Sequence, residues 1–183
     1  DLFILLYNNY NFNSSALGMN KFIDSLHTIV TDLGNFTTAE VLNLSFEDST
    51  HQQRILKDVF DKDIILIDCW ATWCIPCRQQ LPYLDSLASE YKNTVQFISV
   101  SADQSFSKWD KWISRNDKVN KYIIQLHAIN GFENIFFRKL MINAIPRYIL
   151  VSRPGKILNV AMPLPSEKEV FIKKLLSYLG QTQ

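Results

Sequence analysis

The chain has 183 residues, of which 47% are hydrophobic, and its 19 basic and 18 acidic residues leave a formal net charge of +1 at pH 7. This length and composition are typical of a globular domain with one hydrophobic core. The mixed charges contain no basic stripe, which excludes the usual signature of nucleic-acid binding. No apolar run approaches the roughly 18 residues that a membrane-spanning helix needs, so we expect the chain as given to be soluble. Three cysteines are too few for a disulfide scaffold.

The predicted elements alternate between helices and strands along most of the chain. Residues 1–35 contain apolar residues near helical spacing, and we interpret them as a lead-in helical segment ahead of a domain at residues 36–183. The predicted strands are residues 40–46, 64–70, 95–102, 122–127, 147–153 and 156–162. The predicted helices are residues 51–60, 75–92, 105–117, 132–141 and 167–179, the last introduced by a capping box of Ser166 and Glu169. This order predicts an α/β fold.

The stretch WATWCIPC contains Cys74 and Cys77, directly after the apolar run IILIDC. A zinc site of the finger or ribbon type needs four ligands, and the three histidines of the chain are scattered singly. Covalent haem attachment needs a histidine directly after the second cysteine, where this chain has Arg78. A purely structural disulfide across so short a loop would remove little entropy from the unfolded chain. These observations favour a redox-active dithiol without metal or other cofactor.

The two cysteines have different predicted roles because they lie at different places in the predicted helix, with Cys74 at or just before its first residue. The first turn of a helix offers free N–H groups and the positive end of the macrodipole, which lower the pKa of a thiol placed there. Cys74 is therefore the predicted nucleophile. Cys77 lies nearly one turn further on and is expected to be more shielded, so it is the predicted resolving thiol that attacks the mixed disulfide.

Two longer stretches carry a resemblance to a known family. IDCWATWCIPCRQQLP, with Pro82 five residues after the second cysteine, resembles the thioredoxin superfamily and looks most like its TlpA/ResA branch of thiol-disulfide oxidoreductases. NAIPRYILVSRPGKIL resembles the stretch in which the cis-proline of this family, here Pro146, precedes a strand, a turn and another strand. The resemblance covers about residues 40–180. It implies a thioredoxin-like fold, a central mixed sheet flanked by helices, with the insertion of the TlpA/ResA branch within residues 103–143.

The same resemblance implies a substrate-binding surface around the dithiol. In family members the cis-proline faces the two cysteines, and the backbone of the preceding residue, here Ile145, pairs with the substrate chain as an added strand. We assign Trp73, Ile75 and Pro76 to the same surface, together with Ile145 and Pro146. From the residues alone, Trp73 could be a core aromatic, and Pro146 could be an ordinary trans proline, because few X–Pro bonds in folded proteins are cis.

Asp68 is an acid inside the apolar run IILIDCW, where an ionised carboxylate is costly. It could be a structural acid of the core. Thioredoxin, however, has an aspartate at this place that is thought to exchange protons with the second cysteine, and the resemblance implies that role here. We expect a raised pKa for Asp68, because the strand at residues 95–102 offers no lysine partner. Gln80 replaces the titrating glutamate of several ResA-type proteins, and Cys69 points to the opposite face as an unreactive thiol.

These interpretations predict an enzyme that reduces disulfides of exported proteins through a mixed disulfide on Cys74, which Cys77 resolves. The resemblance implies protein disulfide substrates, an upstream thiol electron donor that could be membrane-bound, and a monomer in the bacterial periplasm or cell envelope, which could be anchored to the membrane through a segment absent from this chain. A peroxidase would need an isolated low-pKa cysteine, which this motif does not offer. A thioredoxin-fold binding or chaperone-like module without turnover is the other alternative.

Overall fold

The computed structural model describes residues 40, 42–59, 61–115, 120–153 and 156–180. The chain divides into two units, Asp1–Phe36 and Thr37–Gln183, and every described residue belongs to the second. The predicted lead-in helical segment, residues 1–35, therefore lies outside the described residues. Within the described part of the chain, no helix is both long enough and apolar enough to cross a bilayer.

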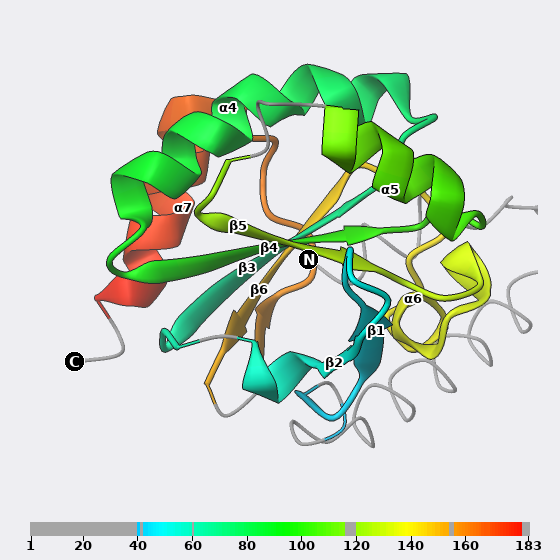
Figure 1. Cartoon of the computed structure of the whole chain (residues 1–183). Coiled ribbons are helices and arrows are strands. Elements are labelled where there is room, and N and C mark those ends of the chain that lie inside the picture. The colour runs from blue at the N-terminus through cyan, green and yellow to red at the C-terminus, as the bar shows by residue number, and fades with distance from the viewer. Residues whose placement is uncertain (1–39, 41, 60, 116–119, 154–155, 181–183) are drawn as a thin grey trace, which may run out of the picture. The chain divides into compact units, whose positions relative to one another are not determined.

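One mixed sheet of seven strands forms the centre of the fold (Figure 1). Its strands are β1 (Ser45–Glu47), β2 (Gln53–Ile55), β3 (Ile64–Trp70), β4 (Val95–Ser101), β5 (Ile123–His127), β6 (Arg147–Ser152) and β7 (Ile157–Asn159). They lie side by side in the order β2-β1-β5-β4-β3-β6-β7. The three central strands β3, β4 and β5 run parallel, and every other neighbouring pair is antiparallel. The predicted α/β fold with a mixed central sheet is thus confirmed.

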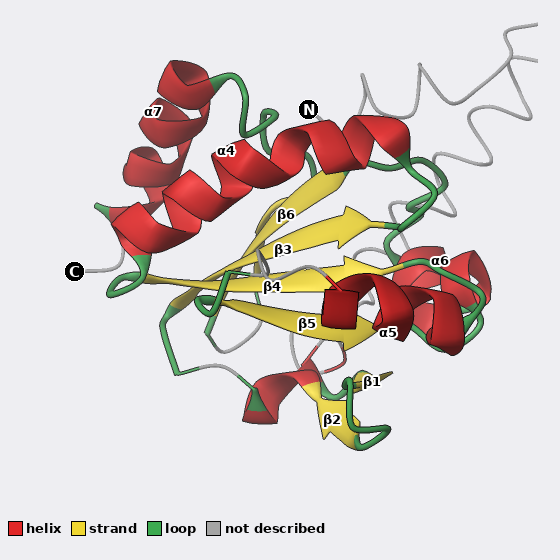
Figure 2. Cartoon of the chain, turned by 45° about the horizontal axis from the view of Figure 1, so that its top comes forward, coloured by secondary structure: helices red, strands yellow, loops and turns green. Residues whose placement is uncertain are grey.

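Helices follow the strands in the predicted alternation. They are α4 (Ile75–Tyr91), α5 (Phe106–Arg115), α6 (Ile135–Lys139) and α7 (Lys168–Leu179), with 3₁₀ turns η1 (Leu56–Asp58) and η2 (Gly131–Glu133). Figure 2 shows α4 and α7 together over one face of the sheet. Between β4 and β6 lie α5, β5, η2 and α6, which occupy the range in which we predict the TlpA/ResA-type insertion.

The centre of the sheet and the two long helices share one hydrophobic core. All seven residues of β3 are buried, as expected for a strand that has neighbours on both sides and layers on both faces. On the face toward α4 and α7, Leu66 belongs to the same buried cluster as Leu84, Leu87, Phe171 and Leu175. This core holds the carboxyl end of β3 and the start of α4 in place, and the cysteine pair lies at that junction.

The structure differs from the sequence-based prediction in the segment before β3. The helix predicted at residues 51–60 is wrong, because β2 pairs antiparallel with β1 there and η1 follows. The turn between the two strands is closed by Asp48, whose carboxylate accepts hydrogen bonds from Thr50 N at 2.8 Å and Arg54 Nε at 2.6 Å. Turn closure by an aspartate therefore overrode the helix-like spacing of the apolar residues.

The predicted capping box of the last helix is also wrong. The residue that precedes α7 is Glu167, which makes no side-chain cap; its carboxylate instead accepts a hydrogen bond from Leu164 N at 3.0 Å. The backbone N–H of Ser166 is used elsewhere, since it donates to Gln80 Oε1 of α4 at 2.9 Å. Gln80 is thus a buried structural link between α4 and the segment that leads into α7.

Candidate active site

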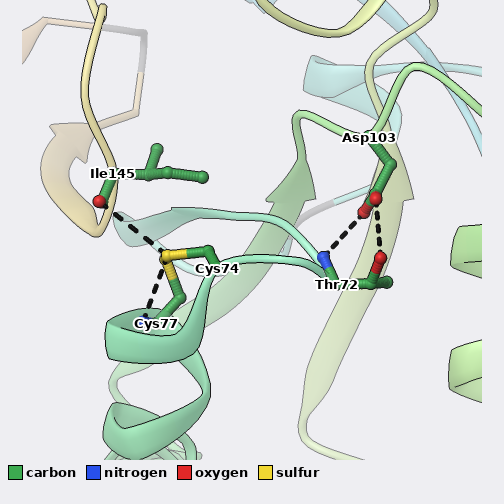
Figure 3. Close-up of a disulfide and its surroundings, with 5 residues drawn as sticks. All are labelled: Thr72, Cys74, Cys77, Asp103 and Ile145. Atoms are coloured by element: carbon green, nitrogen blue, oxygen red, sulfur yellow. Dashed lines mark hydrogen bonds between the residues drawn. A yellow bond between two sulfur atoms is a disulfide. The ribbon is translucent and has the colours of Figure 1, made fainter.

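Cys74 and Cys77 lie at the start of α4, where the chain turns from the end of β3 into the helix. They form a disulfide with an S–S distance of 2.06 Å. Cys74 precedes the first helical residue, and Cys77 N donates a hydrogen bond to Cys74 Sγ at 3.2 Å (Figure 3). Pro76 lies in the first turn, where a missing N–H costs no helical hydrogen bond. This placement provides the N–H donor and the helix end that stabilise a thiolate on Cys74 after reduction.

The residues beside the disulfide are strongly exposed, although the cysteines are not. Trp73 is 59% exposed and Ile75 is 61% exposed, while Cys74 and Cys77 are 3% and 1% exposed. Trp73 is therefore not a core aromatic. The predicted difference in shielding between the two cysteines is small in the disulfide form. The exposed apolar side chains leave a surface at the disulfide that a partner chain could cover.

The segment before β6 faces the cysteine pair from the other side. The Ile145–Pro146 peptide bond is cis, and the carbonyl oxygen of Ile145 lies 3.8 Å from Cys74 Sγ. A disulfide sulfur carries no proton, so in this form the two atoms are in contact without a hydrogen bond. After reduction, the carbonyl oxygen of Ile145 can accept a hydrogen bond from the Cys74 thiol. Ile145 also packs against the buried cluster of Trp70, Ala71, Cys74, Cys77 and Trp109. The chain therefore brings Ile145 and Pro146 to the dithiol, 71 residues after Cys74.

Asp68 is a buried acid on β3, only 2% exposed. Its direct neighbours in the sheet are Ser99 on β4 and Tyr148 on β6. Ser99 Oγ donates a hydrogen bond to Asp68 Oδ2 at 2.9 Å, whereas Oδ1 is buried without a hydrogen-bond partner among the described residues. The nearby hydroxyl group of Tyr148 also favours the ionised form of the carboxyl group. Burial raises the pKa of Asp68 to about 7, and these two hydroxyl groups offset part of that increase.

Cys69, the third cysteine, is a free and fully buried thiol. Burial raises its pKa well above the ordinary value, which makes its thiolate, the reactive form, scarce. This agrees with the prediction of an unreactive thiol on the opposite face of β3.

A cleft of about 350 Å³ lies beside α4. Its walls combine apolar and polar side chains from α4, α5 and the sheet: Trp70, Arg78, Leu81, Pro82, Asp85, Ser99, Trp112, Asn120, Ile123 and Gln125. Ser99, whose hydroxyl group donates to Asp68, is thus one of the residues that line this cleft.

Comparison with known proteins decides the family. The model of a protein family described as thioredoxin-like matches residues 61–157, which is more than half of the chain. This chain belongs to the thioredoxin-like family. The match contains β3, the cysteine pair and Pro146, so it includes the stretches that carried the resemblance except for Leu158 at the end of the second one.

Curated relatives place this thioredoxin-like chain near ResA. It is 25% identical to the thiol-disulfide oxidoreductase ResA of Bacillus thuringiensis over 123 residues, which are 66% of this chain and 67% of ResA. It is 37% identical to thioredoxin 1 of a Nostoc species over 59 residues, 32% of this chain and 51% of that protein. The chain thus spans about half of the length of that thioredoxin and about two thirds of that of ResA.

Solved structures agree with this placement. A candidate thiol-disulfide oxidoreductase of Bacteroides vulgatus is 30% identical, with a TM-score of 0.63, over 74% of this chain and 91% of that one. A solution structure of a similarly described protein from the same species is 35% identical with a TM-score of 0.62, over 74% and 87% of the two chains. The chain is therefore a TlpA/ResA-like member of the thioredoxin superfamily with the cysteine pair of a protein-disulfide oxidoreductase.

The structure adds site residues that sequence reasoning missed. Asp103, just after β4, accepts hydrogen bonds from both the backbone N and the Oγ1 of Thr72 in the cysteine loop (Figure 3). One signal for it is present in the sequence. Since β3 and β4 are parallel, their carboxyl ends meet at one edge of the sheet, so a polar residue after β4 is expected near the loop after β3.

Proposed function

We propose that this chain reduces disulfides of exported proteins, with Cys74 as the nucleophile and Cys77 as the resolving thiol. The observation that carries the proposal is the position of Cys74 Sγ. It accepts a hydrogen bond from Cys77 N at 3.2 Å and lies 3.8 Å from the carbonyl oxygen of Ile145. The N–H group of Cys77 thus favours a thiolate on Cys74. The backbone of a substrate could lie next to Ile145, beside the same sulfur.

The reaction begins with the dithiol form of the enzyme. The Cys74 thiolate attacks one sulfur of a client disulfide, an S–S bond to the client forms, the client S–S bond breaks, and the departing client thiolate takes up a proton. Cys77 then loses its proton and attacks Cys74 Sγ, which expels the second client sulfur as a thiolate. The client gains two electrons and two protons. The enzyme is left with the Cys74–Cys77 disulfide seen in the structure.

The exposed surface around the disulfide supports a role in client binding. Trp73, Ile75 and Pro76 are exposed at the cysteine loop, and Ile145 with Pro146 lies opposite them. An extended client segment between the two could pair with the backbone of Ile145 as an added strand, while its side chains contact the apolar residues. Main-chain pairing accepts many sequences, which suits an enzyme that acts on several clients.

Asp68 is the proposed proton acceptor for Cys77. A carboxyl group whose pKa is raised to about 7 is present in both protonation states near neutral pH, as a general base and acid requires. Its hydrogen bond from Ser99, which lines the neighbouring cleft, supports exchange of the proton with solvent. This assignment keeps the predicted role of Asp68.

The proposed setting is the bacterial periplasm or cell envelope, supported by the likeness to ResA. Each turnover leaves the enzyme as a disulfide, so an upstream thiol donor must supply two electrons before the next client is reduced. We therefore propose that the enzyme receives electrons from that thiol donor and passes them to protein disulfides.

An insulin-reduction assay with a thiol donor tests the proposal. The wild-type protein is expected to accelerate reduction, and Cys74→Ser is expected to abolish the acceleration. A binding or chaperone-like module would give no turnover and would contradict the proposed enzyme. The equilibrium of the cysteine pair with glutathione then gives the direction: a potential near roughly −270 mV indicates a reductant, and one near roughly −120 mV indicates an oxidant.

A further inference from the structure

The carboxylate of Asp103 holds the loop that carries the proposed nucleophile. Thr72 donates to it twice, from its backbone N to Oδ2 at 2.8 Å and from Oγ1 to Oδ1 at 2.7 Å. Figure 3 shows these two bonds ending on different oxygens of the same carboxylate. Ser101 Oγ donates a third bond to Oδ2 at 2.7 Å. We call Asp103 and Thr72 the loop clamp.

The backbone that carries Asp103 is itself firmly held. Ala102 N donates to Trp70 O at 2.8 Å, which ties it to the end of β3. The buried His127 donates from Nε2 to the carbonyl oxygen of Asp103 at 2.7 Å. Gly131 lies so close that an added Cβ would be 2.7 Å from Ala102 O. The loop clamp is therefore anchored to a rigid part of the sheet edge.

A carboxylate suits this position better than a neutral group would. Asp103 is only 2% exposed, and a buried charge is costly unless hydrogen bonds compensate for it. An ionised carboxylate only accepts, so all three donor groups, two from Thr72 and one from Ser101, can donate to it at once. An asparagine would direct its NH₂ group toward one of these donors. The charge thus fixes the orientation of the Thr72 hydroxyl and the course of the loop backbone.

Thr72 lies two residues before Cys74, and the residue between them is the exposed Trp73. We propose that the loop clamp is a positioning device for thiol-disulfide exchange: Asp103, acting through Thr72, holds Trp73 and Cys74 in the orientation that a protein client requires for attack. This inference rests on the proposed function. Its physical basis is that a loop ordered in advance loses less entropy when the client binds.

The test compares a protein client with a small reagent. Thr72→Val removes the hydroxyl donor but keeps the shape and the backbone bond. We expect it to lower the second-order rate constant for insulin reduction about five- to tenfold, as for loss of a hydrogen bond to a charged group. Iodoacetamide needs no docking, so its reaction rate with the Cys74 thiolate should stay within about twofold, with an unchanged pH profile. Thr72→Ser should restore most of the insulin rate.

Two further variants complete the design. Thr94→Val is the matched control, because Thr94 is exposed and its hydroxyl donates to Tyr91 O at the end of α4, at 3.3 Å, far along the helix from the cysteine pair. It should leave both rates unchanged. Asp103→Asn should reduce the insulin rate more than Thr72→Val does, and the double variant should be no worse than Asp103→Asn alone, since both changes remove the same interaction.

The outcomes separate the loop clamp from the proposed function. A wild-type protein that fails to reduce insulin overturns both. If the wild type is active and Thr72→Val has the wild-type insulin rate, the loop clamp has no positioning role, even if the melting temperature falls. If Thr72→Val lowers the reaction rates with insulin and with iodoacetamide equally, the proposal is also overturned. Such a result would show that the variant changes the reactivity of the Cys74 thiolate and not the docking of the client.

Discussion

Ser99 Oγ donates a hydrogen bond of 2.9 Å to Asp68 Oδ2, and the two residues are direct neighbours on β4 and β3. Tyr148 is the corresponding neighbour on β6, and its hydroxyl group also favours the ionised form of the same carboxyl group, whose Oδ1 is buried without a hydrogen-bond partner among the described residues. Only two hydroxyl groups, one of them hydrogen-bonded, lower the pKa of this buried acid. They compensate for less of the desolvation than a lysine would, which is why burial still raises the pKa of Asp68 to about 7.

The first prediction is that Asp68→Asn stabilises the fold, and does so more at high pH. The folded-state pKa of Asp68, about 7, lies above its unfolded value near roughly 3.9. The stabilising contribution of Asp68 to the fold is therefore fully present below its unfolded pKa. It is lost as the pH rises through its folded pKa. The gain from the amide should be larger at pH 8 than at pH 5 by about 2 to 3 kcal/mol.

Urea unfolding of both proteins at the two pH values measures this gain. The same variant should also slow client release more than first attack, because an amide cannot accept the Cys77 proton. Lower stability at pH 8 together with wild-type client release would show that Asp68 is a satisfied structural acid.

The second prediction concerns the two hydroxyl groups around Asp68. Tyr148→Phe and Ser99→Ala each remove a hydroxyl group that favours the ionised carboxylate, so each should raise the pKa of Asp68 further, by about one pH unit. The carboxyl stretching band of Asp68, identified with Asp68→Asn as the blank, follows this titration by infrared spectroscopy. Ser99→Thr keeps a hydroxyl and should titrate like the wild type. An unchanged pKa in both hydroxyl-free variants would contradict the assigned network.

The third prediction separates the two cysteines of the pair. Cys77→Ser should accumulate mixed disulfides with clients, because Cys74 still attacks but no thiol expels the client. Cys74→Ser should trap none. Non-reducing gels of each variant after incubation with oxidised insulin, with the double serine variant as control, measure the trapped complex. Equal trapping by both single variants would mean that attacker and resolver are wrongly assigned.

The fourth prediction uses two adjacent leucines of α7. Leu175 is fully buried in the core shared with α4, whereas Leu176 is 50% exposed. Leu175→Ala should therefore lower the free energy of unfolding by about 2 to 4 kcal/mol, and Leu176→Ala by less than about 1 kcal/mol. Denaturant unfolding at one pH compares them directly. Similar losses would show that α7 packs on the sheet with a different face.

The sequence by itself determined the features that depend on local pattern. The apolar run of β3, the helix after it and the cysteine pair at their junction are all specified by neighbouring residues, because strand and helix have their own periodicities. The burial of Asp68 also followed, since an acid inside an all-buried strand has nowhere else to lie. The early hairpin shows the limit: residues 51–60 have helix-like spacing, but the turn at Asp48 and the pairing of β2 with β1 prevailed.

Only the tertiary structure decided which distant residues meet. Ser99 lies 31 residues from Asp68, and Asp103 lies 31 residues from Thr72, yet both pairs are hydrogen-bonded. These contacts depend on the parallel register of β3 and β4, in which Asp68 is opposite Ser99 and both strands end at the same edge. A shift of one residue would turn every side chain of one strand to the other face. Register is set by packing of the whole sheet, and no local pattern in either strand encodes it.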